Sequence, residues 1–285
     1  INNDGSGASA GHVRIYEYSS NSWTQLGADI DGEATLDNSG QSVSMNAAGT
    51  RVAIGAINND GNGADAGHVR IYEYSSNSWT QLGADIDGET AGDFSGTVSM
   101  NAAGDRVAIG AINNDGNGAE AGHVRIYEYS SNTWTQLGLD IDGEIAGDKS
   151  GESVSMNAAG DRVAIGAGFN DGSGADAGHV RIYEYSSNSW TQLGLDIDGE
   201  ATLDNSGQSV SMNDAGTRVA IGAINNDGNG ADAGHVRIYE YSSNSWNLLH
   251  NDIDAESSGD KSGNSVSMNA AGDQVVIGDS YAGLG

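Results

Sequence analysis

The sequence predicts an all-β protein, a five-bladed β-propeller with four antiparallel strands in each blade. Three observations lead to this prediction: a repeat of about 56 residues, four short alternating segments in every repeat, and no stretch with a helical period. The octapeptide Gly-His-Val-Arg-Ile-Tyr-Glu-Tyr occurs five times, with steps of 56, 55, 56 and 56 residues. Its copies begin at Gly11, Gly67, Gly122, Gly178 and Gly234.

The strands of one repeat follow in a fixed order. A first strand is expected at 42–46 and a second at 51–56, joined by a hairpin in which Gly49 can adopt a positive φ. The third is expected at 67–74, and the fourth begins at Trp79. Apolar and polar residues alternate with period two in these segments, and clusters of Gly, Asn, Asp and Ser separate them.

The two ends of the chain carry complementary halves of one blade. The chain begins with a third and a fourth strand, at 11–18 and 23–30, and ends with a first and a second strand, at 265–268 and 274–278. We therefore expect a single domain, 1–285, whose fifth blade is closed by pairing the N-terminal with the C-terminal strands. Such closure removes the exposed edges of an open array. The alternatives are an open β-solenoid and a fragment of a larger array, and the chain is expected to be processed or excised from a longer one.

Residue size predicts the position of each strand. The second strand, Val52–Ala56, carries slim side chains that suit a place near the propeller axis. Tyr16, Tyr18 and Trp23, with their repeats, are the bulky residues expected to fill the wider space between blades, although they could also form platforms on which carbohydrates stack.

The charge of the chain limits its partners. Lys plus Arg number 11 and Asp plus Glu number 40, which gives a formal net charge of −29. Nucleic acid needs a basic surface and is excluded as a partner, and no apolar run approaches the roughly 20 residues of a membrane helix. Cysteine is absent, so disulfides, zinc–thiolate sites and cysteine nucleophiles are excluded.

One recurring acidic loop separates the second and third strands. Its alternating oxygen-bearing side chains resemble the start of a calcium-binding loop, although the glutamate that would close such a loop is missing. The alternative is an Asn-Asp-Gly turn held by hydrogen bonds of its own side chains. The candidate ligands are Asn58, Asp60, Asn62 and Asp65; Asn113, Asp115, Asn117 and Glu120; Asp171, Ser173 and Asp176; Asn225, Asp227, Asn229 and Asp232; and Asn2, Asp4 and Ser6.

A second acidic loop follows the fourth strand. Four carboxylates within nine residues repel one another, and a divalent cation would relieve that repulsion. The alternative is a solvated acidic rim screened by salt. The candidate ligands are Asp29, Asp31, Glu33 and Asp37; Asp85, Asp87, Glu89 and Asp93; Asp140, Asp142, Glu144 and Asp148; Asp196, Asp198, Glu200 and Asp204; and Asp252, Asp254, Glu256 and Asp260.

One histidine recurs at the start of every third strand. A ring of imidazoles around the axis could bind metal or anions, but one histidine per blade is spaced too widely for a common ion. We therefore expect a hydrogen-bonded side chain at the entry of each strand. The five are His12, His68, His123, His179 and His235.

The repeated runs resemble the FG-GAP repeat of integrin α-chain β-propellers. The resemblance rests on Ser39–Met45, Arg51–Ala56 and Gly67–Tyr72 and covers all five units. Ser39-Gly40 stands where the family has Phe-Gly, and the family's calcium loop is shortened here to 46–51, so that site is not carried over. Integrin propellers usually have seven blades. The resemblance implies an extracellular scaffold for recognition or adhesion.

The sequence therefore predicts a non-enzymatic scaffold, at the cell surface or secreted, which displays five equivalent acidic loops and is stabilised by calcium. Catalysis needs one asymmetric site with differently tuned acids, whereas these carboxylates repeat in every blade. The expected partner is a protein or a glycan surface bound through several weak, parallel contacts, with no insertion into a membrane. The alternative function is a multivalent carbohydrate-binding lectin.

Overall fold

The computed structural model describes residues 6–280, which form short strands joined by turns. Four antiparallel sheets repeat the same plan, so the predicted all-β fold with four-stranded, blade-like sheets is confirmed. Their strands are β5 (Ser42–Met45), β6 (Arg51–Ala56), β7 (His68–Ser75), β8 (Ser78–Gln81) and β9 (Ile86–Asp87); β10 (Ser95–Met100), β11 (Arg106–Ala111), β12 (His123–Ser130), β13 (Thr133–Gln136) and β14 (Ile141–Asp142); β15 (Ser153–Met156), β16 (Arg162–Ala167), β17 (His179–Ser186), β18 (Ser189–Gln192) and β19 (Ile197–Asp198); β20 (Ser206–Met212), β21 (Arg218–Ala223), β22 (His235–Ser242), β23 (Ser245–Leu248) and β24 (Ile253–Asp254).

The fourth strand of each sheet is interrupted. In the first complete sheet, β8 pairs with the second half of β7, whereas β9 pairs with its first two residues, His68 and Val69. The Leu82 N–H still donates to the Ile71 carbonyl, and the chain bulges between Leu82 and Ile86. The bulge places an aspartate, Asp85, directly before β9. The continuous fourth strand that the sequence suggested is therefore corrected to two short strands.

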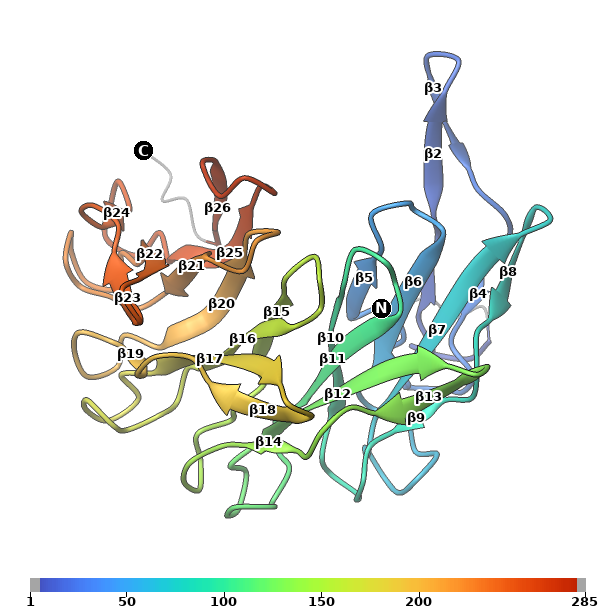
Figure 1. The fold of residues 1–285 in the computed structure, drawn as a ribbon, viewed down its shortest axis with the longest axis horizontal. Helices are drawn as coiled ribbons and strands as arrows, with labels where there is room; N and C mark the ends of the chain where they lie inside the picture. Colours follow the sequence, from blue (N-terminus) through green and yellow to red (C-terminus); the bar gives the residue numbers. More distant parts are fainter. Residues whose placement is uncertain (1–5, 281–285) are drawn as a thin grey trace.

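The sheets follow an arc with their first strands on the inside (Figure 1). Neighbouring first strands are joined by side-chain hydrogen bonds: the Met100 N–H donates to Ser44 Oγ at 2.9 Å, and the Met156 N–H donates to Ser99 Oγ at 2.9 Å. The same bond links the next sheets, and the fourth strands lie at the outer rim (Figure 1).

The second strands contain small residues because neighbouring sheets approach them closely. A Cβ on Gly110 of β11 would overlap the carbonyl oxygen of Gly151, which precedes β15 of the next sheet. Gly55, Gly166 and Gly222 meet the following sheet in the same way. Glycine is required at these places by backbone proximity, and not by the φ angle, since none of the four has a positive φ.

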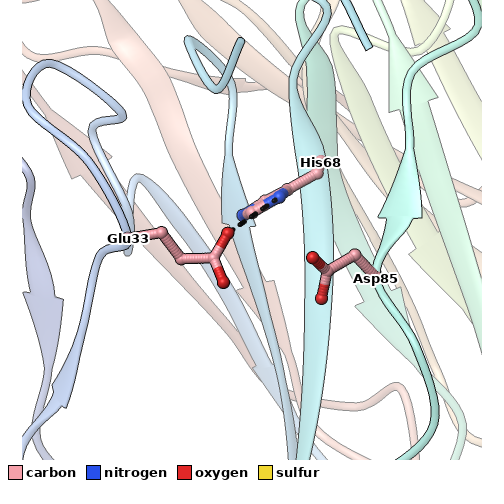
Figure 2. A group of neighbouring side chains, drawn as sticks. All are labelled: Glu33, His68 and Asp85. Atoms are coloured by element: carbon pink, nitrogen blue, oxygen red, sulfur yellow. Dashed lines mark ion pairs between the residues drawn. The ribbon is translucent and has the colours of Figure 1, made fainter. Parts of the chain in front are cut away.

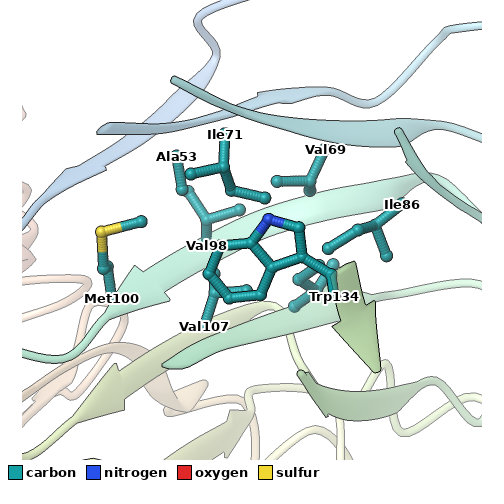
Figure 3. Packing of buried hydrophobic residues seen from close by; sticks show 9 residues of the cluster. Ala53, Val69, Ile71, Ile86, Val98, Met100, Val107 and Trp134 are labelled. Atoms are coloured by element: carbon teal, nitrogen blue, oxygen red, sulfur yellow. The ribbon is translucent and has the colours of Figure 1, made fainter. Parts of the chain in front are cut away.

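The core lies between sheets, where aromatic side chains of one sheet pack on the one before. Trp134 of β13 lies against Ala53, Ile71 and Val98 (Figure 3), and its indole N–H donates to the Leu82 carbonyl at 2.7 Å. Tyr129 lies beside Trp134 with ring centroids 5.1 Å apart and the ring planes tilted by 48°. The predicted packing role of these aromatic residues is therefore confirmed at the internal junctions.

The two ends of the chain form separate small sheets. The N-terminal part contains β1 (His12–Val13), β2 (Tyr16–Ser19), β3 (Ser22–Gln25) and β4 (Ile30–Asp31), in which β1 pairs with β4 and β2 with β3. The C-terminal β25 (Ser262–Met268) and β26 (Val275–Asp279) form a two-stranded sheet, and Ser262 makes one isolated parallel bridge to Gly234.

The expected closure of a fifth blade is absent from this structure. The β2–β3 hairpin and the β25–β26 pair lie at opposite ends of the open arc (Figure 1), and no strand pairing joins them. Whether the ends meet depends on the rotation between neighbouring sheets, summed over every junction, which no single repeat encodes. Residues 6–280 contain no helix long and apolar enough to cross a membrane.

Candidate metal centres at the blade junctions

Each junction between neighbouring sheets brings together one glutamate, one histidine and one aspartate. Ligand atoms of the three side chains lie within 4.8 Å of one another, and Figure 2 shows the first group, in which the side chains converge. The four groups, which we call the junction groups, are Glu33, His68 and Asp85; Glu89, His123 and Asp140; Glu144, His179 and Asp196; and Glu200, His235 and Asp252.

The strands explain why these three residues meet. His68 is the first residue of β7, and Asp85 directly precedes β9, which pairs with that same end of β7. Glu33 comes from the preceding sheet, two residues after β4. Each group therefore joins two sheets, with the glutamate from one and the other two residues from the next.

The histidine of each group is buried and has few partners. The side chain of His68 is 1% exposed, and its Nδ1 lies 3.9 Å from Glu33 Oε2, which is too far for a hydrogen bond. Neither ring nitrogen of His123 has a hydrogen-bond partner among the described residues. The expected hydrogen-bonded strand-entry histidine is therefore corrected: the Nε2 atoms of all four internal histidines are buried and unpaired.

Burial keeps these imidazoles neutral. Burial, together with the adjacent guanidinium of Arg125 or Arg181, lowers the pKa of His123 and of His179 to about 4. The pKa values of His68 and His235 are lowered for the same reasons. A neutral imidazole has a free lone pair, which is the form that binds metal.

Each carboxylate is held through one of its oxygens. Glu33 Oε1 lies 3.4 Å from Arg70 Nη1, which leaves Oε2 on the side of His68. Asp85 Oδ1 accepts a hydrogen bond from Gln81 Nε2 at 2.5 Å. Arg70 is itself fixed, because its Nη2 donates to the Asp31 carbonyl at 2.7 Å. Basic and amide side chains thus orient the carboxylates while each keeps a second oxygen.

The fourth group departs from this plan. Leu248 occupies the position of Gln81, so Asp252 loses the amide that holds its counterparts. Its Oδ1 is buried without a hydrogen-bond partner, and its Oδ2 lies 3.9 Å from His235 Nδ1. The Glu, His and Asp are all present, but their support is weaker.

The loops between the second and third strands use their side chains in hydrogen bonds within the loop and to the loop that follows the fourth strand. Asn58 Nδ2 donates to Asp65 Oδ1 at 2.8 Å, Asp60 Oδ1 accepts from the Asp65 N–H, and Asn62 Nδ2 donates to the Gly88 carbonyl. The same pattern recurs at Asp115 and Asn117, at Asp171, and at Asp227 and Asn229. None of these aspartates joins a junction group. The turn interpretation therefore describes these loops better than the calcium-loop interpretation; Asn2 and Asp4 lie outside the described residues.

The carboxylates of the second loop are divided among different tasks. Among the described residues, all the counterparts of Glu33 except Glu256 and all those of Asp85 except Asp29 enter junction groups. The two loops that supply one group lie in neighbouring repeats. Asp37 is buried, and its Oδ2 accepts from the Ala34 N–H at 2.8 Å and from Asn59 Nδ2 at 3.1 Å. Asp93, Asp148, Asp204 and Asp260 accept similar backbone bonds. Asp31, Asp87, Asp142, Asp198 and Asp254 stand in the short strands that pair with the histidine strands. A single ion surrounded by four carboxylates of one loop is therefore not formed.

Small grooves lie beside the junction groups. Three of them, of about 170, 240 and 180 Å³, are each lined by a tyrosine and a tryptophan of one sheet and two aspartates of the preceding one, such as Tyr127 and Trp134 with Asp85 and Asp87. A wider depression of about 490 Å³ is lined by Glu144 and Asp196, so this junction group can be reached from solvent.

The junction groups could not be predicted as groups, because their members lie in different repeats. Glu33 and His68 are 35 residues apart, and only the sheet order brings them together. The available signal was that histidine, glutamate and aspartate all recur with the same period.

Known proteins share the fold of this chain. No protein-family model matches it, and neither does any curated protein. Among solved structures, it is similar to a periplasmic gluconolactonase of Pseudomonas aeruginosa, with a TM-score of 0.62, 11% identity, and coverage of 93% of this chain and 71% of that one. It is also similar to hydrazine synthase of Kuenenia stuttgartiensis, with a TM-score of 0.56, 11% identity, and coverage of 96% and 70%.

Two further similar structures, both from Bacteroides, are described as 6-phosphogluconolactonases. The one from Bacteroides fragilis has a TM-score of 0.58, 8% identity, and coverage of 93% of this chain and 67% of that one. The one from Bacteroides uniformis has a TM-score of 0.52, and this chain spans only 54% of its length. These proteins have lactonase-type seven-bladed β-propellers. At such identities the likeness shows the fold alone.

Proposed function

We propose that this chain is a non-enzymatic scaffold for multivalent recognition or adhesion at a cell surface or outside the cell. The observation that carries the proposal is the repetition of one surface: every internal junction presents the same junction group with acidic loops around it. Several weak contacts made in parallel by equivalent sites give strong overall binding.

Repetition also argues against an active site. Catalysis by paired acids needs two groups with different environments at one place. Here the histidine of every internal junction is buried to the same degree and faces the same carboxylate types. We therefore do not propose lactonase activity for this chain, although lactonases share its fold.

The charge of the chain limits the partner. A net charge of −29 favours a protein or glycan surface and disfavours nucleic acid. The resemblance to FG-GAP repeats supports the same role, although the loops that the sequence offered for calcium use their side chains in hydrogen bonds. The proposed scaffold is the open arc of blade-like sheets, whose internal junctions present the repeated surface.

The acidic loops provide the test. Asp60, Asp115, Asp171 and Asp227 can be changed to Asn one after another, because the amide oxygen still accepts the loop hydrogen bond while the charge is lost. We expect retention on immobilised extracellular-matrix proteins to fall stepwise, by roughly 100-fold or more in total. Retention on none of these surfaces, or complete loss from one substitution alone, would contradict the proposal.

The grooves favour a second candidate, a lectin. Each presents tyrosine and tryptophan beside two carboxylates, a combination suited to stacking and hydrogen bonding with a sugar, and about 200 Å³ suits one sugar ring at most. A glycan array followed by calorimetry distinguishes the two functions. One bound sugar per groove, lost in Trp134→Leu at one groove only, would favour the lectin.

A further inference from the structure

We propose that each junction group binds one divalent transition-metal ion of the zinc class and thereby links two neighbouring blades. The second group, Glu89, His123 and Asp140, carries this inference furthest. This site goes beyond the scaffold role, since the ions would bind whether or not the chain has an adhesion partner.

The buried histidine is the first observation. His123 is 1% exposed, and neither of its ring nitrogens has a hydrogen-bond partner among the described residues. Leaving a buried polar group unpaired costs about 1–3 kcal/mol, so such atoms normally have a partner. Its Nδ1 lies 3.9 Å from Glu89 Oε2, which is too far for a hydrogen bond. Two ligands of one tetrahedral zinc ion lie about 3.4 Å apart, so a small movement of the exposed Glu89 side chain brings both atoms to one ion.

The carboxylates are the second observation, because their supports resemble those around known metal ligands. Arg125 Nη1 lies 3.5 Å from Glu89 Oε1, and Gln136 Nε2 donates to Asp140 Oδ1 at 2.5 Å. Each carboxylate thus has one oxygen held and the other free. Outer partners of this kind orient the ligands of a metal before it arrives.

The donor set selects the class of ion. One imidazole nitrogen and two carboxylate oxygens suit Zn²⁺ and related first-row ions, with water completing the coordination. Calcium takes about 6–8 oxygen ligands, which three side chains with one nitrogen do not supply. We therefore assign zinc-class ions to the junction groups and not calcium.

Binding at a junction stabilises the arc. Glu89 belongs to one sheet, whereas His123 and Asp140 belong to the next, so one ion is shared between two sheets. An ion that binds only the folded chain raises the free energy of unfolding according to its concentration and affinity.

The test is titration of the metal-free chain with ZnCl₂ by calorimetry, repeated with CoCl₂ to record the visible absorption of bound cobalt. We expect about four ions per chain, a cobalt spectrum with the intensity of low-coordinate sites, and an unchanged titration in the presence of CaCl₂. His123→Gln should remove one ion of the four, and Asp115→Asn, in a loop outside the group, should remove none.

A second variant separates loss of the site from loss of folding. Glu89 is 41% exposed, so Glu89→Gln should leave the circular dichroism spectrum intact while it weakens one site by roughly 10-fold or more. The proposal is overturned if zinc does not saturate near four ions, if calcium competes equally, or if folded Glu89→Gln binds like the unchanged chain.

Discussion

The internal junctions and the two ends of the chain contain the same residues in different surroundings. Trp134 is 9% exposed between two sheets, whereas its counterpart Trp23, in the hairpin β2–β3, is 68% exposed. Ala53 is fully buried, and its counterpart Val276 in β26 is 72% exposed. The comparison teaches that a repeat does not bury its own apolar residues; the neighbouring sheet buries them.

The C-terminal end also differs in sequence at the positions that internal junctions use. At the first internal junction Gly27 lies so close to the next sheet that an added Cβ would be 2.8 Å from the Trp79 side chain. The residue at the equivalent position near the C-terminus is His250, which has a φ of 85°. Asp279 and Val276 replace alanines of the second strand. A fifth junction built from the two ends would therefore need local shifts that the internal junctions do not require.

The largest expected difference concerns the tryptophans. Trp134→Ala should lower the free energy of unfolding by about 3–5 kcal/mol, because it empties the space between two sheets and removes the bond to Leu82. Trp23→Ala should change it by less than about 0.5 kcal/mol. Urea denaturation followed by circular dichroism measures both. Equal losses would show that the ends meet in solution and bury Trp23.

Glycine-to-alanine substitutions test whether the backbones of neighbouring sheets approach more closely at an internal junction than at the C-terminal end. Gly110→Ala should destabilise by about 1–3 kcal/mol, because the new methyl group meets the Gly151 carbonyl of the next sheet. Gly278→Ala meets only the rotatable hydroxyl of Ser265 and should be close to neutral. Thermal unfolding of the two variants gives the answer, and similar melting temperatures would refute the close approach.

Acid should weaken the internal junctions. The pKa of His123 is about 4 in the folded chain against 6.5 in the unfolded one, so the unfolded chain binds the proton first as pH falls. Stability is therefore full above pH 6.5 and declines toward pH 4, by on the order of 1–2 kcal/mol for this histidine at pH 5. Unfolding in chelator at pH 7 and pH 5 measures the decline. His123→Gln should reduce it, and an unchanged decline would contradict the assignment.

The smallest expected effect concerns one hydrogen bond between first strands. Ser99→Ala removes the acceptor of the Met156 N–H and should cost about 1 kcal/mol. Ser267 occupies the equivalent position in β25, and no sheet follows β25–β26 among the described residues. Ser267→Ala should therefore cost almost no stability. Denaturant midpoints of the pair are the readout, and equal shifts would show that another strand pairs there.

Much of the fold could be predicted because its signals are local. Alternation in Arg51–Ala56 and the turn before it placed β6 and its hairpin, and both are present. The candidate site was predicted less well. The spacing of Asp60 resembled that of a calcium ligand, but its carboxylate accepts a hydrogen bond from its own loop. His68 was expected to form a hydrogen bond at the start of its strand, but it lies beside Glu33 of another repeat.

The sequence by itself determined the repeat, the strands, the aromatic packing and the residue types that can bind metal. The tertiary structure alone decided which glutamate meets which histidine and that the arc stays open. The physical reason is the sequence separation of the interacting residues. Strands are specified by residues a few positions apart, whereas each junction joins side chains from different repeats. The rotation at each junction is set by contacts such as Gly110 against Gly151, and it accumulates along the chain.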